Sequence, residues 1–279
     1  MLRRAAKMAL LPHGALFRER RPGLVILIYH RVGGGTASEI DLPEGLFERQ
    51  MAYLRDHARV VALDAVLDGS LDDAGGGPGD AVAVTFDDGS RDLYEQAFPV
   101  LLRYRIPATV FLVTRYIETQ TPFDFGAYGR SAHRSAPLTW PQVREMAASG
   151  LVTIGGHTHG HVDLTRVPDA EARAEVERCA ALIADRVGQP PAHFAYPWGR
   201  LSPRARAIAG ERFRTAVRGG SAKNPFGSLD LLGLWRRPVQ QSDGFWLFTM
   251  KVRSYLDGEE VLREFVSSRR QAGRAAGLA

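Results

Sequence analysis

Two short segments of the sequence concentrate side chains that bind metals and move protons. The first is Thr85-Phe86-Asp87-Asp88-Gly89, in which two adjacent carboxylates follow an apolar run. Adjacent residues at the end of a strand point in different directions, so one carboxylate can bind a metal while the other faces the water beside it. A plain Asp-Asp-Gly turn explains the same letters without chemistry. A functional site and a plain turn therefore explain the two carboxylates equally well when this segment is considered alone.

The second segment is Gly155-Gly156-His157-Thr158-His159-Gly160-His161. Three histidines within five positions exceed what core packing requires, and imidazole is a ligand for zinc and other first-row metals. His157 and His161 are four positions apart, so one helical turn would bring both to one face and turn His159 away. An extended segment would pair His157 with His159 instead, and a metal-free hydrogen-bonded cluster is the third interpretation.

Taken together, the two segments favour a three-ligand metal site made of Asp88, His157 and His161. One carboxylate and two imidazoles leave coordination positions for water and substrate, as a catalytic metal site requires.

The elements that must position these residues alternate between strands and helices. Apolar, β-branched runs predict strands at 24–29, 60–63, 81–86, 108–113, 151–154, 194–196 and 213–217. Helical spacing predicts helices at 43–56, 90–104, 140–149, 169–187, 202–210 and 259–271, with loops at 69–80 and 115–137. Such alternation indicates parallel strands joined by crossover helices. In folds of this kind, ligands bind at the carboxyl ends of the strands. Periodicity alone leaves a closed barrel and an open sheet both open.

Composition narrows the class of protein. The 279 residues are 45% hydrophobic and 24% charged, which is typical of a soluble globular chain with one large domain or two small ones. The net charge of +5 fits a solvated surface, or attraction to an anionic membrane or a phosphate-bearing glycan. No basic–aromatic pattern points to nucleic acid.

Cys179 is the single cysteine, so an intramolecular disulfide is excluded and a buried thiol in a reducing compartment is expected.

The N-terminal residues 1–22 are predicted to be a tail or an amphipathic helix, and residues 23–279 a single domain. The apolar run within residues 8–11 is too short for a transmembrane helix and is a poor signal-peptide core. We therefore expect a cytoplasmic protein, with peripheral membrane contact left open.

The two motifs, in this order and each after a strand, resemble the NodB-homology polysaccharide deacetylases, carbohydrate esterase family 4. Val162-Asp163-Leu164 continues the second motif as in family members, and residues 194–199 (Phe-Ala-Tyr-Pro-Trp-Gly) resemble the third. The resemblance runs from about Leu24 to Pro238. It implies a distorted (β/α)7 barrel.

The resemblance also implies a role for each matching residue. Asp88, His157 and His161 match the metal ligands, for Zn²⁺ first and Co²⁺ or Ni²⁺ as alternatives, and Asp87 matches the general base. The backbone N–H of Trp198 matches a donor of the oxyanion hole. The substrate is expected to contact Tyr196, Pro197, Trp140 and Arg237.

The sequence departs from the family in two places. Many members have an arginine in the third motif that orients the base, but here that position is Ala195, so Arg236 or Arg237 is expected to replace it. Many members also supply a general-acid histidine from a strand near the C-terminus, and this chain has no histidine after His193. His30, which ends the first strand, is the expected acid, as in the circularly permuted subgroup that acts on poly-N-acetylglucosamine and exopolysaccharides.

The expected activity is metal-dependent removal of acetyl groups from N-acetylhexosamine residues of a polysaccharide or a lipid-linked glycan precursor, in exopolysaccharide biosynthesis. Two alternatives stay open. The same site can hydrolyse an O-acetyl or N-formyl group of a sugar, and Ala195 leaves room for a glycan-binding module that has lost catalysis.

Overall fold

The computed structural model describes residues 19–73, 79–124 and 135–256. The predicted helix at 259–271 and most of the predicted N-terminal segment 1–22 lie outside the described residues. Within those residues, no helix combines the length and the apolarity needed to cross a bilayer.

Seven parallel strands close into a barrel. They are β1 (Gly23–Tyr29), β5 (Ala81–Phe86), β6 (Ala108–Leu112), β7 (Val152–Gly156), β8 (His193–Ala195), β9 (Thr215–Gly219) and β11 (Leu234–Pro238). The order is β1-β11-β9-β8-β7-β6-β5, and pairing of β1 with β5, in register from Leu24↔Ala81 to Tyr29↔Phe86, completes the ring. The first strand thus lies between β5 and the last strand, β11. This closed (β/α)7 barrel confirms the predicted fold.

Three short additions border the barrel. β4 (Arg59–Val60) extends the sheet beside β5, and β10 (Asn224–Pro225) pairs antiparallel with the start of β1. β2 (Arg31–Val32) and β3 (Asp41–Leu42) form a separate two-stranded sheet just after β1.

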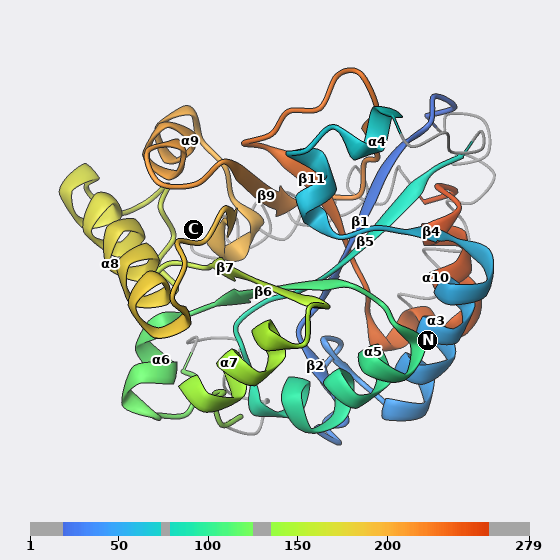
Figure 1. Cartoon of the computed structure of the whole chain (residues 1–279), viewed down its shortest axis with the longest axis horizontal. Helices are drawn as coiled ribbons and strands as arrows, with labels where there is room; N and C mark the ends of the chain where they lie inside the picture. Colours follow the sequence, from blue (N-terminus) through green and yellow to red (C-terminus); the bar gives the residue numbers. More distant parts are fainter. Residues whose placement is uncertain (1–18, 74–78, 125–134, 257–279) are drawn as a thin grey trace, which may run out of the picture.

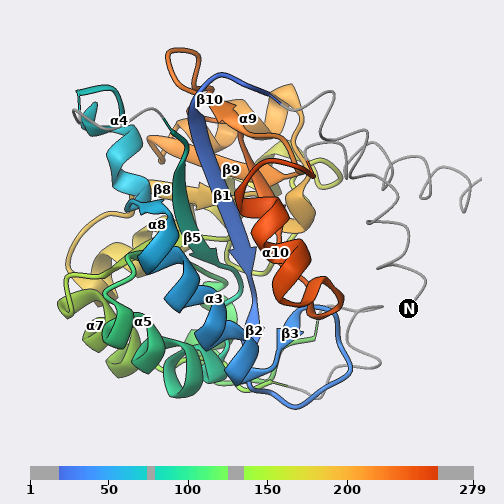
Figure 2. The ribbon, with the colours of Figure 1, turned by 90° about the vertical axis from the view of Figure 1, so that its right-hand side faces the viewer.

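Helices surround the barrel, as Figures 1 and 2 show. The longer ones are α3 (Glu44–His57), α5 (Phe98–Tyr104), α6 (Thr114–Thr119), α7 (Trp140–Ala148), α8 (Asp169–Val187), α9 (Pro203–Gly210) and α10 (Gly244–Val252). The shorter segments are η1 (Leu63–Val66), α4 (Ser70–Asp73), η2 (Leu93–Ala97, a π-helix), η4 (Pro197–Gly199) and η5 (Gln241–Asp243).

Side-chain caps fix where two of these helices begin. Thr139 precedes α7 and forms a capping box with Gln142, while the Ser202 side chain accepts a hydrogen bond from the Ala205 N–H at the start of α9.

Successive side chains of each strand point to opposite faces of the sheet, and this produces two apolar layers. Leu24, Ile26, Ala83, Phe111 and Val217 belong to the cluster inside the barrel, whereas intervening residues pack against the helices. The outer layer includes Cys179, which is fully buried, as predicted for a structural thiol. Burial raises the pKa of this thiol to about 12.

Most predicted elements are confirmed, and the exceptions lie in irregular stretches. The predicted loop 115–137 begins instead with helix α6, and its residues 125–134 lie outside the described part. The predicted loop 69–80 contains the one-turn helix α4. The predicted strand 60–63 is only the two-residue β4, followed by η1. Strand β11 and helix α10 were not predicted, because β11 carries two adjacent arginines and α10 is apolar almost throughout.

Candidate active site

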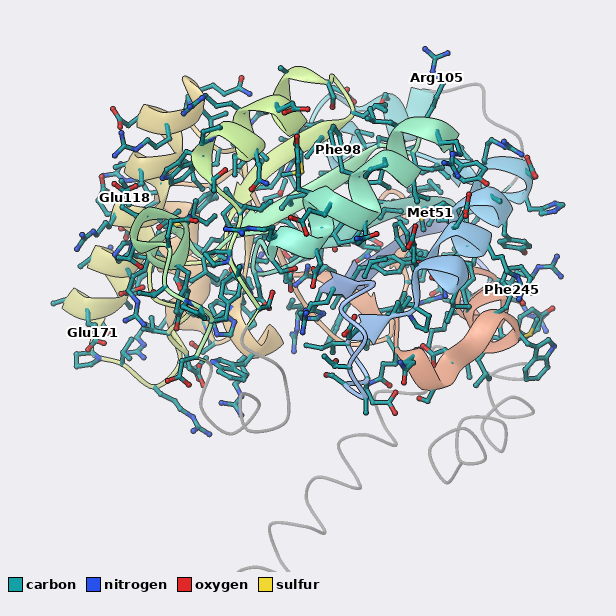
Figure 3. All side chains as sticks on the ribbon, turned by 90° about the horizontal axis from the view of Figure 1, so that it is seen from below. Met51, Phe98, Arg105, Glu118, Glu171 and Phe245 are labelled. Carbon is teal, nitrogen blue, oxygen red and sulfur yellow. The ribbon has the colours of Figure 1, made fainter. Side chains whose placement is uncertain are left out.

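The metal-binding candidates meet at the carboxyl end of the barrel. Strands β1 and β5 point downward in Figure 2, so Figure 3 looks onto this end. Asp88 follows β5 and His157 follows β7, and the Oδ1 atom of Asp88 lies 3.7 Å from Nε2 of His157 and 3.7 Å from Nε2 of His161. The three ligand atoms lie within 4.8 Å of one another. The structure therefore brings together two segments that are about seventy positions apart.

His157 is held in a single orientation by the neighbouring strand. Its ring is buried and its Nδ1 lies 2.7 Å from the carbonyl oxygen of Ala195, in β8. Because a carbonyl only accepts, Nδ1 carries the proton and the lone pair of Nε2 faces Asp88. Burial lowers the pKa of His157, which keeps the ring neutral and able to bind a cation.

A loop, and not a helical turn, brings His161 beside His157. Residues 157–161 have no helical structure, and both Thr158 and His161 adopt left-handed backbone angles, with φ of 62° and 61°. This corrects the expected helical turn, although the two rings still meet, with centroids 4.9 Å apart. His159 points elsewhere, as predicted: its Nδ1 lies 2.9 Å from Oγ1 of Thr114, and burial lowers its pKa to about 4.

Both the backbone conformation of Asp88 and the burial of its carboxylate cost free energy. Its φ of 73° lies in the left-handed region, which non-glycine residues rarely adopt. Burial raises the pKa of Asp88 well above its usual value, and the charge on Asp87 adds to the effect. Backbone strain of this kind is concentrated at functional sites, where surrounding structure enforces it.

Asp87 lies beside the three candidate ligands and forms a buried ion pair with Arg236. Two parallel hydrogen bonds join the guanidinium to the carboxylate, from Nη1 to Oδ1 at 2.6 Å and from Nη2 to Oδ2 at 2.7 Å. Burial alone would raise the pKa of Asp87, but Arg236 and His157 outweigh it and hold this pKa below its usual value. The carboxylate is therefore ionised and fixed, 3.9 Å from Nε2 of His157.

The two arginines of β11 face opposite sides of the barrel wall. Arg236 points inward, whereas the buried Arg237 donates outward to the carbonyl oxygens of Ser221 and Lys251. This resolves the choice between them in favour of Arg236. It also corrects the prediction that Arg237 contacts substrate, because its side chain is committed to holding a loop against α10.

His30 directly follows β1 and continues the alternation of Leu24 and Ile26, whose side chains belong to the cluster inside the barrel. Burial lowers its pKa to about 4, and the charges of Asp87, Arg236 and His157 also act on it, so it lies within their electrostatic reach. Tyr29 pairs with Phe86, and the Asp87 N–H donates to the carbonyl oxygen of Tyr29, so His30 follows β1 next to the strand end that carries Asp87. Its role as general acid stays a prediction.

The third motif forms a tight turn over the site. Trp198, in η4, adopts φ 62°, is 40% exposed and places its ring 4.8 Å from that of His161. Gly199, at φ 66°, follows it, and a Cβ there would lie 2.7 Å from the backbone of Gly219 in β9. Only glycine permits this close approach, which fixes the turn against the barrel. The oxyanion role of the Trp198 amide stays a prediction.

Two predicted substrate contacts are corrected by burial. Tyr196 is fully buried, and its hydroxyl donates to the carbonyl oxygen of Leu232 at 3.0 Å. Pro197 is also buried. Neither side chain is available to a sugar ring. Trp140, the first residue of α7, is partly exposed and donates from Nε1 to Glu118 at 2.7 Å, and its contact with substrate stays a prediction.

The donor set fits a divalent transition metal. Two imidazole nitrogens and one carboxylate oxygen are the usual ligands of zinc in a catalytic site, and ligands of tetrahedral zinc lie about 3.3 Å from one another. The two 3.7 Å separations at Asp88 are close to that spacing. The contact from Nδ1 of His157 to a carbonyl is the partner that metal-bound histidines normally have.

Comparison with known proteins identifies the family. Residues 74–212 match the family described as polysaccharide deacetylase. The chain carries a polysaccharide deacetylase domain of the NodB-homology type. The matched region contains both motifs, and His30 and Arg236 lie outside it.

Two bacterial proteins illustrate the similarity to curated relatives. The Bacillus subtilis protein YxkH, named as a polysaccharide deacetylase, is 28% identical over 184 residues, which are 66% of this chain and 60% of that protein. The poly-beta-1,6-N-acetyl-D-glucosamine N-deacetylase of Staphylococcus aureus is 24% identical over 184 residues, covering 63% of this chain and 59% of that protein. The chain thus spans about three fifths of the length of these relatives.

Solved structures share the fold. IcaB from Ammonifex degensii is 26% identical with a TM-score of 0.68, over 84% of this chain and 97% of that one. The Streptococcus pyogenes deacetylase PplD, solved in complex with acetate, is 21% identical with a TM-score of 0.68, over 83% of this chain and 99% of that one. These similarities agree with the closed seven-stranded barrel.

Proposed function

We propose that this polysaccharide deacetylase domain is a metal-dependent de-N-acetylase. The observation that carries the proposal is the position of an ionised, arginine-clamped Asp87 beside the cluster of Asp88, His157 and His161. A fixed base next to three convergent metal-binding atoms is the arrangement needed to activate water for attack on an acyl group. A divalent metal, Zn²⁺ by preference and otherwise Co²⁺ or Ni²⁺, would be held by those three residues.

In this proposal the chain's own residues divide the proton transfers between them. When bound, the metal supplies Lewis-acid polarisation of the acyl carbonyl and lowers the pKa of the attacking water. Asp87 accepts the proton of that water while Arg236 keeps its carboxylate in place. His30, in its protonated imidazolium form, delivers a proton to the departing amine, because an amide anion is a very poor leaving group. The backbone N–H of Trp198 donates to the oxyanion.

The proposed substrate is an N-acetylhexosamine residue of a polysaccharide or of a lipid-linked glycan precursor. The name of the Staphylococcus aureus relatives supports a β-1,6-linked N-acetylglucosamine polymer as the first candidate. The exposed ring of Trp198 beside His161 offers an apolar face on which a sugar can stack.

The test is acetate release from β-1,6-linked N-acetylglucosamine oligosaccharides by the full chain loaded with zinc or cobalt. We expect release with one free amine appearing per acetate, and loss of activity in Asp87→Asn. Asp185→Asn, at an exposed position on α8, is the matched control and should remain active. Equal acetate release by the Asp87→Asn variant would rule out the proposed base.

The products also separate the alternative activities. Acetate released with a free hydroxyl, and without amine, would identify an O-deacetylase, and formate would identify a deformylase. Oligosaccharide binding without any acyl release would support a glycan-binding module that has lost catalysis.

A further inference from the structure

The two candidate histidine ligands are held in different ways. His157 is oriented by the neighbouring strand, through its contact with the carbonyl oxygen of Ala195. His161 lies further along, in irregular backbone with a left-handed φ of 61°, which a residue other than glycine rarely adopts. Contacts between this loop and the rest of the domain must therefore enforce the position of His161.

The middle of the loop is tied to two helices at His159. The N–H of His159 donates to the carbonyl oxygen of Glu175 in α8 at 3.2 Å, and its carbonyl oxygen accepts from the N–H of Arg115 in α6 at 2.9 Å. The contact of its ring with Thr114 adds a further link to α6. These contacts hold the loop up to the residue before Gly160.

The side chain of Glu175 provides the next contact, closer to the ligand. Its Oε2 accepts the N–H of Gly160, the residue directly before His161, at 2.6 Å. Glu175 is half-buried, whereas Glu177, on another face of α8, is exposed and pairs with Arg212. A carboxylate accepts a backbone N–H more strongly than a neutral oxygen does. The peptide group that precedes Gly160 is thereby fixed, one residue before His161.

Gly160 leaves room for this carboxylate. A Cβ at this position would lie 3.2 Å from Oε1 and 3.4 Å from Oε2 of Glu175, closer than an ordinary van der Waals contact at the nearer atom. The φ of Gly160 lies outside the left-handed region, so its backbone conformation is open to other residues. The missing side chain therefore serves the close approach of the carboxylate.

Beyond His161 the loop is anchored a second time. Oδ2 of Asp163 accepts a hydrogen bond from Nη1 of Arg200 at 2.5 Å, which joins the loop to the turn that carries Trp198. Two carboxylates thus bracket the ligand, from Glu175 on one side and Asp163 on the other. Because the second anchor stays when the first is removed, loss of Glu175 should displace His161 without unfolding the loop.

We propose that Glu175 is a positioning residue that presents His161 to the divalent metal. Glu175 lies outside the cluster of candidate ligands and acts through the backbone of Gly160. It can have this role only if the proposed function holds, because it works through a metal ligand. Groups that orient a metal ligand from behind contribute to metal affinity, and this contribution can be measured apart from catalysis.

The test is the zinc affinity of the full chain, measured by competition with a chromophoric chelator. Glu175→Ala should weaken zinc binding roughly ten- to a hundredfold, the usual cost of removing a group behind a metal ligand. Glu175→Gln should stay within about threefold of the unchanged chain, because its amide oxygen can accept the same N–H.

Gly160→Ala tests the same contact from the loop side. It should also weaken zinc binding, because its Cβ displaces the Glu175 carboxylate. In the Glu175→Ala background, Gly160→Ala should add little, since two substitutions that break one contact are not additive.

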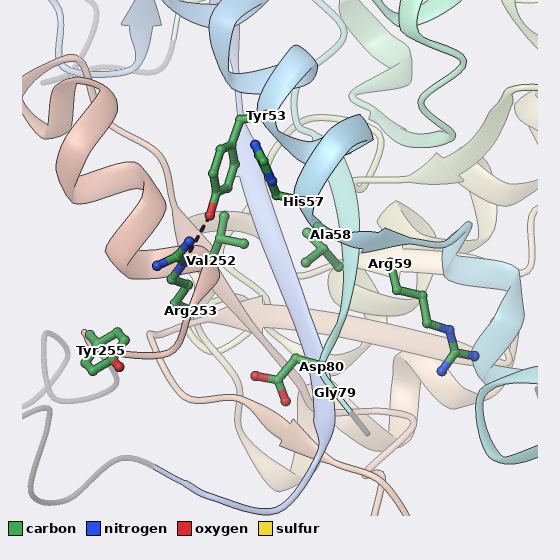
Figure 4. Close-up of a pocket in the computed structure, with 10 residues that line it drawn as sticks. Tyr53, His57, Ala58, Arg59, Gly79, Asp80, Val252, Arg253 and Tyr255 are labelled. Carbon is green, nitrogen blue, oxygen red and sulfur yellow. Dashed lines mark hydrogen bonds between the residues drawn. The ribbon is translucent and has the colours of Figure 1, made fainter. Parts of the chain in front are cut away.

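Two controls separate positioning from general damage. Glu177→Ala removes an exposed carboxylate of the same helix and should bind zinc as the unchanged chain does. Tyr53→Phe removes the hydroxyl that accepts from Arg253 in a cavity beside the start of β5 (Figure 4), and should also leave zinc affinity unchanged. Without metal, Glu175→Ala should melt close to Tyr53→Phe, since each variant loses one side-chain hydrogen bond.

The outcomes distinguish this role from the proposed function. If the unchanged chain binds zinc and Glu175→Ala or Gly160→Ala binds it equally well, the positioning role is overturned and the metal site stands. A lower melting temperature of Glu175→Ala with unchanged zinc affinity would show a purely structural role and would also overturn it. Failure of the unchanged chain to bind zinc would overturn the metal site and this role together.

Discussion

Arg236 and Asp87 are joined by two parallel hydrogen bonds across the barrel interior, although 149 positions separate them in the chain. Ala195 stands in the third motif at the position where the family resemblance leads us to expect an arginine that orients the base. An arginine from β11 reaches the same carboxylate that a third-motif arginine would orient, because β11 pairs with β1, which pairs with β5. We propose that Arg236, from β11, takes over this orienting role.

Arg236→Lys is expected to lower kcat/KM for deacetylation by roughly ten- to a hundredfold. Lysine keeps the charge but cannot make two parallel hydrogen bonds, so Asp87 loses its fixed orientation. Steady-state acetate release measures the effect, and metal content should not change. Arg212→Lys, at an exposed pair with Glu177, is the matched control. Full activity in Arg236→Lys would show that the clamp is not needed.

His30→Gln is expected to reduce kcat on an N-acetylated sugar by about 10²- to 10⁴-fold, the range typical of a lost general acid. The same variant should hydrolyse an aryl acetate almost as fast as the unchanged chain, because a phenolate leaves without protonation. Comparing the two substrates separates proton delivery from general damage to the site. An equal loss on both substrates would argue against His30 as the acid.

Metal content should depend on the three candidate ligands and not on the central histidine of the motif. After loading with zinc and dialysis, Asp88→Asn, His157→Ala and His161→Ala should each retain far less metal than the unchanged chain, as measured by atomic emission. His159→Gln should retain it, because His159 contacts Thr114 and faces away from the cluster. Loss of metal in His159→Gln alone would require a different ligand set.

Asp64 is expected to stabilise the amino end of the barrel in a pH-dependent way. It accepts hydrogen bonds from Thr153 at 2.7 Å and from the buried His193 at 3.1 Å. The contact with His193 is the main cause that lowers the pKa of Asp64 from 3.8 to about 2. Since the folded-state pKa is lowered, this stabilisation is complete above pH 3.8 and is lost as the pH falls toward 2.

Asp64→Asn should therefore lower the free energy of unfolding by about 1 kcal/mol at pH 6, the usual net value of one hydrogen bond. The difference from the unchanged chain should shrink below pH 4. Urea unfolding at pH 6 and pH 3 measures both values, with Asp185→Asn as an exposed control. A difference that is the same at both pH values would contradict the assignment.

The sequence by itself determined the alternation of strands and helices and the identity of the metal-binding candidates. Apolar runs such as residues 81–86 indicate strands that are buried on both faces, and helical spacing located helices such as the one at 169–187. The spacing of Asp88, His157 and His161 after two strands was enough to predict their meeting, because carboxyl ends of parallel strands share one edge.

Only the tertiary structure decided which residues support that cluster. Whether Arg236 or Arg237 orients Asp87 depends on which side of β11 faces inward, and two adjacent arginines give no alternation from which to read it. The approach of His161 depends on left-handed backbone angles that no periodicity reveals. As part of the third motif, Tyr196 was expected to contact substrate. In the structure its side chain is fully buried. These features arise from packing between segments far apart in the chain, and local sequence does not encode such contacts.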